Sequence, residues 1–388
     1  MKRFEKVATE LKKAEVDFAI LVSPSNVIYT SGFEIPYWPY FMGDMSMGLP
    51  MVTACINVLE PELKLLASDY YKTRLERAGV SNARYYVSFS HLYKNDVISN
   101  YEKALKSVMN DMMKQRKKAI IGVEKVFFPQ YILQMIEKQF PNVIFVDITD
   151  NLNRARCIKT ADEISIIKKA AKAADAAQDK LYEISRYEGE YTELDVWFEV
   201  QKAASDKAGV LTPFVGELVT GPRTGTSDYP LGPTARKIKR GDIAIMDICP
   251  RVSGYWGDCS NVVVFWDKPG KEQMEYFKVV RDVYEVGKEL VRPGIVCREL
   301  NQKMEEVYKM HGYEMCSYQG HQIGANVNES PKITYCEDTV LEENMVLCIE
   351  PQLYTGRRGK TGVRLEKMLH VTANGAKELN HFKWGIEL

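Results

Sequence analysis

The sequence lacks the features that mark several specialised classes of protein. Its 52 Lys and Arg residues are balanced by 52 Asp and Glu residues, so it has no basic excess of the kind that nucleic-acid binders and anionic-membrane binders carry. No uncharged apolar run approaches about 18 residues, and charges occur throughout the N-terminal segment, which fits neither a membrane span nor a secretion signal. We expect a small or locally charged partner, no nucleic acid and no membrane.

Cysteine is also used sparingly. The eight cysteines show no CxxC spacing and are too scattered for a disulfide scaffold. Reduced thiols in a cytoplasm fit this pattern best, so we expect a cytoplasmic protein. Cys249 and Cys259 lie close in the sequence to two acidic residues discussed below; a thiolate metal ligand is one interpretation, and a buried apolar thiol is the commoner one.

The length of 388 residues and the 45% hydrophobic content allow two domains, each with its own core. In the N-terminal part, helical patterns alternate with strand-like runs, which predicts an α/β domain. These runs lie at 16–22, 64–67, 119–123 and 143–146. The polar segment 147–159 then breaks the pattern, and Thr160 and Glu163 have capping-box spacing. We place the domains at 1–155 and 156–388.

In the second domain, long helical patterns alternate with pairs of strand-like segments. Paired strands predict an antiparallel sheet with helices packed against it, which is an α+β architecture. The expected helices span 160–184, 192–208, 272–291 and 297–311.

Acidic residues occur inside the apolar strand-like segments of this domain. The stretch 241–266 contains two β-rich runs around a turn-prone centre and predicts a hairpin. If the turn is centred between Val252 and Ser253, Asp247 and Asp258 lie directly opposite each other, about 5 Å apart on one face of the hairpin.

Facing carboxylates in apolar surroundings repel each other and are costly to desolvate, so they need a shared proton, a basic partner or a metal. The same pattern recurs at Glu350 in NMVLCIEPQLY and at Glu366 in TGVRLEKMLHV. Four such carboxylates favour cations over separate salt-bridged acids, which remain the alternative. His321 in YQGHQIGANVNESP adds a nitrogen ligand, and the small residues around it allow close approach.

The order and spacing of these motifs resemble a known family. Asp247-x10-Asp258, the GH-x-x-G around His321, the IEP around Glu350 and the GVR-x-E ending at Glu366 look like the five-ligand signature of the pita-bread metallopeptidases. SNVIYTSGFE and IKTADEISIIKKAAKAAD resemble the creatinase, aminopeptidase P and prolidase (Xaa-Pro dipeptidase) branch. The resemblance implies an N-terminal creatinase-like α/β domain, a C-terminal pita-bread domain with a dinuclear metal site, and a homodimer.

The resemblance also implies roles for the ligands. Asp247 would bind one ion, Asp258 and Glu366 would bridge both, and His321 and Glu350 would complete the other. The cofactors would be two divalent ions, from manganese, cobalt, iron or zinc, with manganese favoured. Such a metallohydrolase would use a bridging hydroxide to attack an amide C–N bond of a short peptide or small molecule, with Glu350 as the proton shuttle.

Further residues are expected around this centre. Arg364 matches an arginine that supports the ligands in this family, with a surface arginine as the alternative. Tyr255 and Asp228 are candidate substrate contacts, although strand packing and turn formation also explain them. Tyr37 and Trp38 belong to an aromatic segment that occupies the region where the family reaches over a partner subunit's active site; dimer packing is the alternative.

The sequence departs from the family at three histidines that bind substrate. Asn328 stands seven residues after the ligand histidine, Ser317 stands four residues before it, and the segment 220–242 contains no histidine. Asparagine and serine donate hydrogen bonds but do not titrate near pH 7. Asn328 is therefore a candidate catalytic substitute. Two alternatives to peptide cleavage stay open, namely creatinase-like hydrolysis or a lyase reaction on a non-peptide small molecule, and a non-catalytic binding module.

Overall fold

The computed structural model describes residues 2–34, 49–114, 116, 118–226, 232–314, 318–355 and 361–386. The chain divides into two compact units, Met1–Arg156 and Cys157–Leu388. Among the helices in these ranges, none has the length and apolar character needed to cross a membrane.

The N-terminal unit contains a six-stranded sheet in the order β4-β3-β2-β1-β5-β6. Its elements are α1 (Arg3–Lys13), β1 (Phe18–Leu21), α2 (Pro24–Ser31), β2 (Val52–Asn57), β3 (Glu62–Ser68), η3 (Asp69–Tyr71), α3 (Lys72–Arg77), β4 (Ala83–Tyr86), α4 (Val97–Met113), β5 (Ala119–Val123), α5 (Gln130–Gln139), β6 (Val143–Asp147) and α6 (Thr149–Cys157). The strands β1 and β5 pair in parallel, whereas β1 and β2 pair antiparallel.

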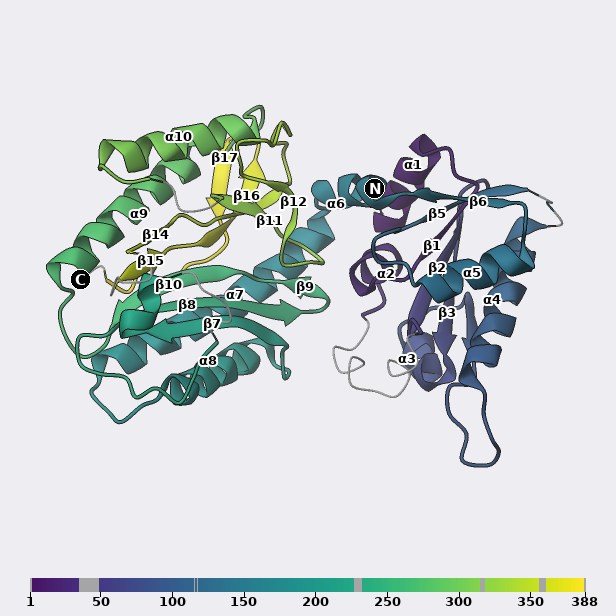
Figure 1. The fold of residues 1–388 in the computed structure, drawn as a ribbon, viewed down its shortest axis with the longest axis horizontal. Helices are drawn as coiled ribbons and strands as arrows, with labels where there is room; N and C mark the ends of the chain where they lie inside the picture. The colour runs from purple at the N-terminus through teal and green to yellow at the C-terminus, as the bar shows by residue number, and fades with distance from the viewer. Residues whose placement is uncertain are drawn as a thin grey trace. The chain divides into compact units, whose positions relative to one another are not determined.

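Each face of this sheet carries its own core. Along β1, Phe18 and Ile20 belong to one hydrophobic cluster, and Ala19 and Leu21 belong to the other, because successive side chains of a strand point to opposite faces. Figure 1 shows α4 and α5 over one face, and α1 and α2 over the other. The predicted α/β domain is confirmed.

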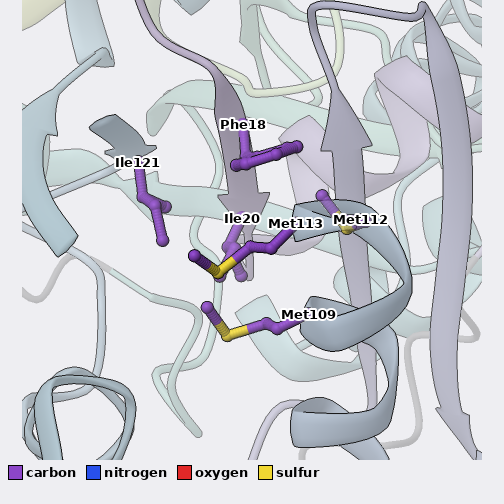
Figure 2. A pocket seen from close by; sticks show the side chains of 6 residues that line it. All are labelled: Phe18, Ile20, Met109, Met112, Met113 and Ile121. Atoms are coloured by element: carbon purple, nitrogen blue, oxygen red, sulfur yellow. The ribbon is translucent and has the colours of Figure 1, made fainter. Parts of the chain in front are cut away.

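A small apolar pocket lies between α4 and the sheet. Figure 2 shows the six side chains that line it, namely Phe18, Ile20, Met109, Met112, Met113 and Ile121. All six are apolar, so they offer no hydrogen-bonding or charged group to a ligand. The pocket is a packing feature of the core.

The C-terminal unit contains only antiparallel strand pairs among its described residues. Its elements are α7 (Ala161–Arg186), α8 (Glu193–Ala208), β7 (Phe214–Thr220), η4 (Gly221–Gly225), β8 (Ile243–Val252), β9 (Tyr255–Trp256), β10 (Cys259–Val264), α9 (Lys271–Leu290), α10 (Cys297–Met310), β11 (Gly320–Gln322), β12 (Glu329–Lys332), β13 (Val346–Ile349), β14 (Gln352–Tyr354), β15 (Gly362–Arg364), β16 (Lys367–Thr372) and β17 (Gly375–Glu378). The sheets have the orders β10-β8-β7 with β9 beside β8, β12-β11-β13-β16-β17, and β14-β15.

Helices cover these sheets on two sides. Figure 1 shows the strands of this unit between the pair α7 and α8 and the pair α9 and α10. The capping box is present before α7, since Thr160 and Glu163 each accept a hydrogen bond from the other's backbone N–H. The predicted α+β architecture is confirmed, and the four expected helices begin and end within two residues of the observed bounds.

The β8–β10 hairpin differs from the predicted one. Asp247 pairs with Ser260, not with Asp258. The turn is formed by Ser253 and Gly254, whose φ angles are 48° and 83°. A two-residue hairpin turn of this kind needs positive φ at both positions, and glycine adopts positive φ readily. Direct opposition of the two acids was therefore a wrong prediction. The register differs by two residues, however, and a two-residue shift leaves both side chains on the same face.

Two close backbone approaches join the segments that carry the remaining site residues. Ser260 and Glu366 exchange backbone hydrogen bonds of 3.3 and 3.0 Å. At Gly320, with φ 149°, an added Cβ would lie only 2.0 Å from the carbonyl oxygen of Cys348, so glycine is needed where β11 meets β13. The prediction that small residues flank His321 for close approach is confirmed at this position.

Candidate metal centre

The structure brings the five predicted ligands together from separate strands. Asp247 lies in β8, Asp258 precedes β10, His321 lies in β11, Glu350 follows β13, and Glu366 lies between β15 and β16. Together with Cys249 and Cys348 they form three overlapping groups. Within each group, the ligand atoms that the residues offer lie within 4.8 Å of one another. The groups are Asp258, His321, Cys348 and Glu366; Asp247, Cys249 and Asp258; and Asp247, Glu350 and Glu366. Neighbouring cations would share ligands in such an arrangement.

His321 has the protonation state and orientation of a ligand. Its Nδ1 lies 2.9 Å from the Gln322 carbonyl oxygen, which assigns the N–H to Nδ1 and leaves the lone pair on Nε2. Nε2 faces Asp258, Glu366 and Glu350 at 3.6, 3.7 and 3.9 Å. Burial lowers the pKa of the imidazole, so His321 is neutral near pH 7. A backbone acceptor for the second nitrogen is the usual way in which a metal-binding histidine is held.

The buried carboxylates favour protons in the absence of cations. Burial, opposed by Arg364, raises the pKa of Glu350 to about 7. Burial and the neighbouring carboxylates raise the pKa values of Asp258 and Glu366 well above their usual range. A cation placed among these groups reverses this tendency, because it favours the ionised form of each carboxylate.

Unsatisfied oxygens show that the residues fit such cations. Both carboxylate oxygens of Glu366 and Oε2 of Glu350 are buried and have no hydrogen-bond partner among the described residues. Buried polar atoms in native proteins are nearly always paired, so a group of orphaned oxygens points to a bound species that is not part of the chain. Four carboxylates and one imidazole form the oxygen-rich donor set that divalent metals accept.

Arg364 is buried beside the ligands and is not a surface residue. Its guanidinium donates to Asp247 Oδ2 and to Glu217 Oε1, and Nη1 lies 3.9 Å from Glu350 Oε1. Tyr354 accepts from Nε and Nη2 at 3.2 and 3.1 Å. The alternative of a surface arginine is wrong, because only 3% of its side chain is exposed.

Sequence reasoning missed two polar side chains at this centre. Glu217 lies in β7 opposite Asp247, and it carries the same signal as the other acids, a carboxylate within an apolar strand. Tyr318 lies near Glu350, since burial and the Glu350 carboxylate together raise the pKa of its hydroxyl, and its ring centroid lies 6.2 Å from that of His321. No local pattern distinguishes Tyr318, because its contact with Glu350 depends on the pairing of β11 with β13.

The cysteines near the site differ from one another. Cys249 Sγ lies 3.2 Å from Asp258 Oδ1 and donates to it, whereas Cys259 accepts from Gln178 Nε2 at 3.4 Å. Cys348, which had no predicted role, lies within the group of ligand atoms around His321. Burial raises the thiol pKa values of all three cysteines well above the usual range, so these thiols are protonated in the metal-free protein.

The predicted substrate contacts have different outcomes. Tyr255 is fully buried in a hydrophobic cluster, and its hydroxyl donates to Glu163 at 3.2 Å; this packing does not fit the predicted pocket position. Asn328 lies in the loop between β11 and β12, and its side chain is exposed. Its catalytic role stays a prediction. Three further candidates, Asp228, Tyr37 and Trp38, lie outside the described residues, as does Ser317.

Comparison with known proteins assigns the chain to a family. It matches metallopeptidase family M24 over residues 165–373 and the creatinase/prolidase N-terminal domain over residues 3–158. It is 27% identical over 382 residues to the Xaa-Pro dipeptidase of Pyrococcus furiosus, covering 97% of each chain. It is also 30% identical over 251 residues to the Xaa-Pro dipeptidase of Lactobacillus helveticus, covering 64% of this chain and 67% of that one.

A solved structure shows the same fold over the whole length. The crystal structure of a dipeptidase from Pyrococcus horikoshii OT3 aligns with a TM-score of 0.81 at 21% identity, covering 99% of both chains. The ordered ligand motifs, the two domains and the buried carboxylate cluster thus lead to one assignment. The chain belongs to metallopeptidase family M24, as a metal-dependent peptidase with a creatinase/prolidase N-terminal domain.

Proposed function

We propose that this chain is a dinuclear metal-dependent dipeptidase that cleaves Xaa-Pro peptide bonds. The observation that carries the proposal is the group of buried carboxylate oxygens with no partner among the described residues, beside a neutral histidine. The relatives from Pyrococcus furiosus and Lactobacillus helveticus are named Xaa-Pro dipeptidases, which supports Xaa-Pro dipeptides as the substrate. The comparisons do not favour the alternative of a non-peptide substrate.

Five residues would hold the ions, namely Asp247, Asp258, His321, Glu350 and Glu366. When bound, two divalent ions lower the pKa of water and polarise a carbonyl group. The groups around Asp247 and around His321 support one subsite each, because Asp258 and Glu366 each occur in a group with Asp247 and in the group with His321. Glu350 groups with Asp247 and Glu366, whereas the resemblance implied that it shares an ion with His321. Arg364 holds Asp247 from the side of β15.

The chain's own residues supply the proton chemistry. Glu350 would accept a proton from the attacking water and deliver it to the leaving nitrogen. Without cations burial raises its pKa to about 7, and bound cations would lower this pKa and keep the carboxylate ready to accept a proton. Tyr318 is one of the groups that oppose the effect of burial on the pKa of Glu350, so its hydroxyl is placed to donate to the same carboxylate. Burial and the surrounding carboxylates raise the pKa of Tyr318, so its phenol stays protonated and acts only as a donor. We propose that Tyr318 orients Glu350 during this transfer.

Because three substrate-binding histidines of the family are missing, the range of substrates that the enzyme cleaves is the most informative test of the proposal. Metal-depleted protein is reloaded with Mn2+ and assayed on matched Xaa-Pro and Xaa-Ala dipeptides, longer peptides, and small amides and amidines. We expect two ions per chain and cleavage of the Xaa-Pro dipeptides. Cleavage of small amides without any peptide cleavage contradicts the proposal in favour of a repurposed enzyme. Absence of bound metal contradicts both.

Asn328→His tests the departure directly. If Asn328 stands where an imidazole would contact substrate, restoring the imidazole raises kcat/KM on Xaa-Pro dipeptides and adds a titration near pH 6.5 to the rate profile. An unchanged rate and profile would place the substrate elsewhere. Metal content is the control, since the exposed Asn328 lies outside the groups of ligand atoms.

Four finer features are also proposed. Manganese is favoured because the donor set is mostly carboxylate oxygen, and metal analysis of the protein as purified tests it. The family resemblance supports a homodimer, which light scattering tests. A cytoplasmic location is supported by the described cysteines, all of which are free, and localisation of the tagged protein tests it. The division at 155/156 is supported by the two compact units, and expression of 156–388 alone tests it.

A further inference from the structure

Glu217 is a buried acid near the metal centre that is not one of the five proposed metal ligands. It lies in β7 directly opposite Asp247 of β8, and only 6% of its side chain is exposed. Carboxylates opposite each other on neighbouring strands repel, and burial strengthens the repulsion. A reason is therefore needed for a fifth buried carboxylate beside four that already converge.

Arg364 joins these two carboxylates. One guanidinium nitrogen donates to Asp247 Oδ2 and another donates to Glu217 Oε1. Both contacts are charge-assisted, and together they fix the plane of the guanidinium group, because arginine presents its donors in a rigid fork. Tyr354 accepts from the remaining face of the fork. Glu217 thus anchors Arg364 through Nη2, while Nη1 binds Asp247.

A purely structural ion pair does not account for Glu217. Its Oε2 is buried and has no hydrogen-bond partner among the described residues, so its surroundings do not satisfy it fully. Asp247 alone already provides Arg364 with a carboxylate partner. A second buried carboxylate on the same arginine adds desolvation cost that a stabilising pair would avoid.

Charge balance at a loaded centre gives the missing reason. Before a bound water ionises, two divalent ions and one guanidinium carry five positive charges, and five carboxylates carry five negative charges. These are the carboxylates of Asp247, Asp258, Glu350, Glu366 and Glu217. Without Glu217, the Asp247 carboxylate must balance both Arg364 and a bound cation, so the Arg364 charge opposes the binding of a cation to the same carboxylate.

We propose that Glu217 is a positioning residue of the metal centre, which neutralises and anchors Arg364 so that this arginine orients Asp247 without weakening cation binding there. This inference rests on the proposed function for the presence of two ions. Glu217 touches no reacting atom; it acts through Arg364. Groups that orient a ligand from behind contribute roughly 10–100-fold to metal affinity.

The test measures metal affinity without substrate. The full-length protein is stripped with chelator and titrated calorimetrically with Mn2+. In Glu217→Gln we expect one of the two binding events to weaken roughly 10–100-fold, while Glu217→Asp, which keeps the charge, restores most of the affinity. The matched control is Glu163→Gln, a change at another buried carboxylate whose capping box also accepts glutamine; its titration should match that of the wild type.

A double-mutant cycle separates this role from a structural one. In an Arg364→Gln background, Glu217→Gln should change neither event by more than about twofold, because the charge that Glu217 neutralises is gone. Wild-type affinity in Glu217→Gln, or an equal loss in both backgrounds, overturns the proposal. If Glu217→Gln does not fold, the Mn2+ affinity of Arg364→Gln is compared with that of the double variant. A tenfold difference between these two affinities overturns the proposal.

Failure here is distinguishable from failure of the proposed function. A wild type that binds two ions but cleaves no Xaa-Pro dipeptide removes the proposed substrate and leaves the role of Glu217 standing. A wild type that cleaves these dipeptides, with Glu217→Gln titrating identically, removes only the role of Glu217.

Discussion

Two buried glutamates of the C-terminal unit differ in whether their carboxylate oxygens have hydrogen-bond partners. Glu193, at the start of α8, accepts hydrogen bonds from the side chains of Thr220, Arg223 and Thr234, and from two of their backbone N–H groups. Glu366 is equally buried, yet neither of its oxygens has a hydrogen-bond partner among the described residues.

The difference separates two uses of buried charge. The Glu193 carboxylate ties a strand end to the turn that follows, and its bonds explain its burial. The Glu366 carboxylate destabilises the fold unless a species outside the chain occupies its lone pairs. Burial alone therefore does not identify a functional acid; burial without partners does.

The largest effect is expected from Glu366→Gln. Removing this charge should abolish binding of at least one ion and lower kcat/KM by more than about 100-fold, beyond the range of groups that only support a ligand. Metal content after gel filtration and the rate on Xaa-Pro dipeptides check it. In chelator at pH 8 the same variant should unfold at a higher temperature than the wild type. At this pH the wild type must either keep Glu366 protonated or bury its charge, and both cost stability that glutamine does not cost. Full metal content in the variant would contradict the inference that Glu366, unlike Glu193, is buried in order to bind a cation.

Tyr318→Phe tests whether the Tyr318 hydroxyl donates to the Glu350 carboxylate during proton transfer. A hydrogen bond to a charged group contributes about 1.5–3 kcal/mol, so kcat should fall by about ten- to a hundredfold while both ions stay bound. Steady-state kinetics and metal analysis provide the two readouts. An unchanged kcat would remove Tyr318 from the proton transfer.

The stability of the metal-free protein should fall as pH rises. The folded-state pKa of Glu350 is about 7, above the ordinary value of 4.5, so its contribution is fully present below about pH 4.5 and is lost as the pH passes through about 7. Asp258 and Glu366 shift in the same direction. Thermal unfolding in chelator from pH 5 to pH 8 should show the decline, and Mn2+ should reverse it above pH 7. A metal-free melting temperature that rises over this interval would contradict the raised pKa values.

The smallest effect on the metal centre is expected from Glu193→Gln. This change removes the buried charge that pairs with Arg223 and should lower the free energy of unfolding by about 3–5 kcal/mol, without changing metal stoichiometry. Chemical denaturation and metal analysis together measure it. Loss of an ion in this variant would show that the Glu193 carboxylate and the metal ligands are not independent.

Much of the site was accessible from the sequence because it depends on local patterns. Asp247, Glu350 and Glu366 are acids within apolar strands, and a carboxylate there needs compensation in any fold. The capping box at Thr160 and Glu163 similarly predicted the start of α7. Such signals lie within a few residues of one another, so no tertiary information is needed to recognise them.

The remaining features depended on the tertiary structure. The sequence determined two domains, their element types and a set of acids that require cations, because periodicity and residue chemistry are local properties. Only the tertiary structure decided that Tyr255 packs in a core, that the hairpin turns at Ser253 and Gly254, and that Glu217 meets Arg364 across 147 residues of chain. These contacts form between segments far apart in the sequence, where burial and strand register select the partners.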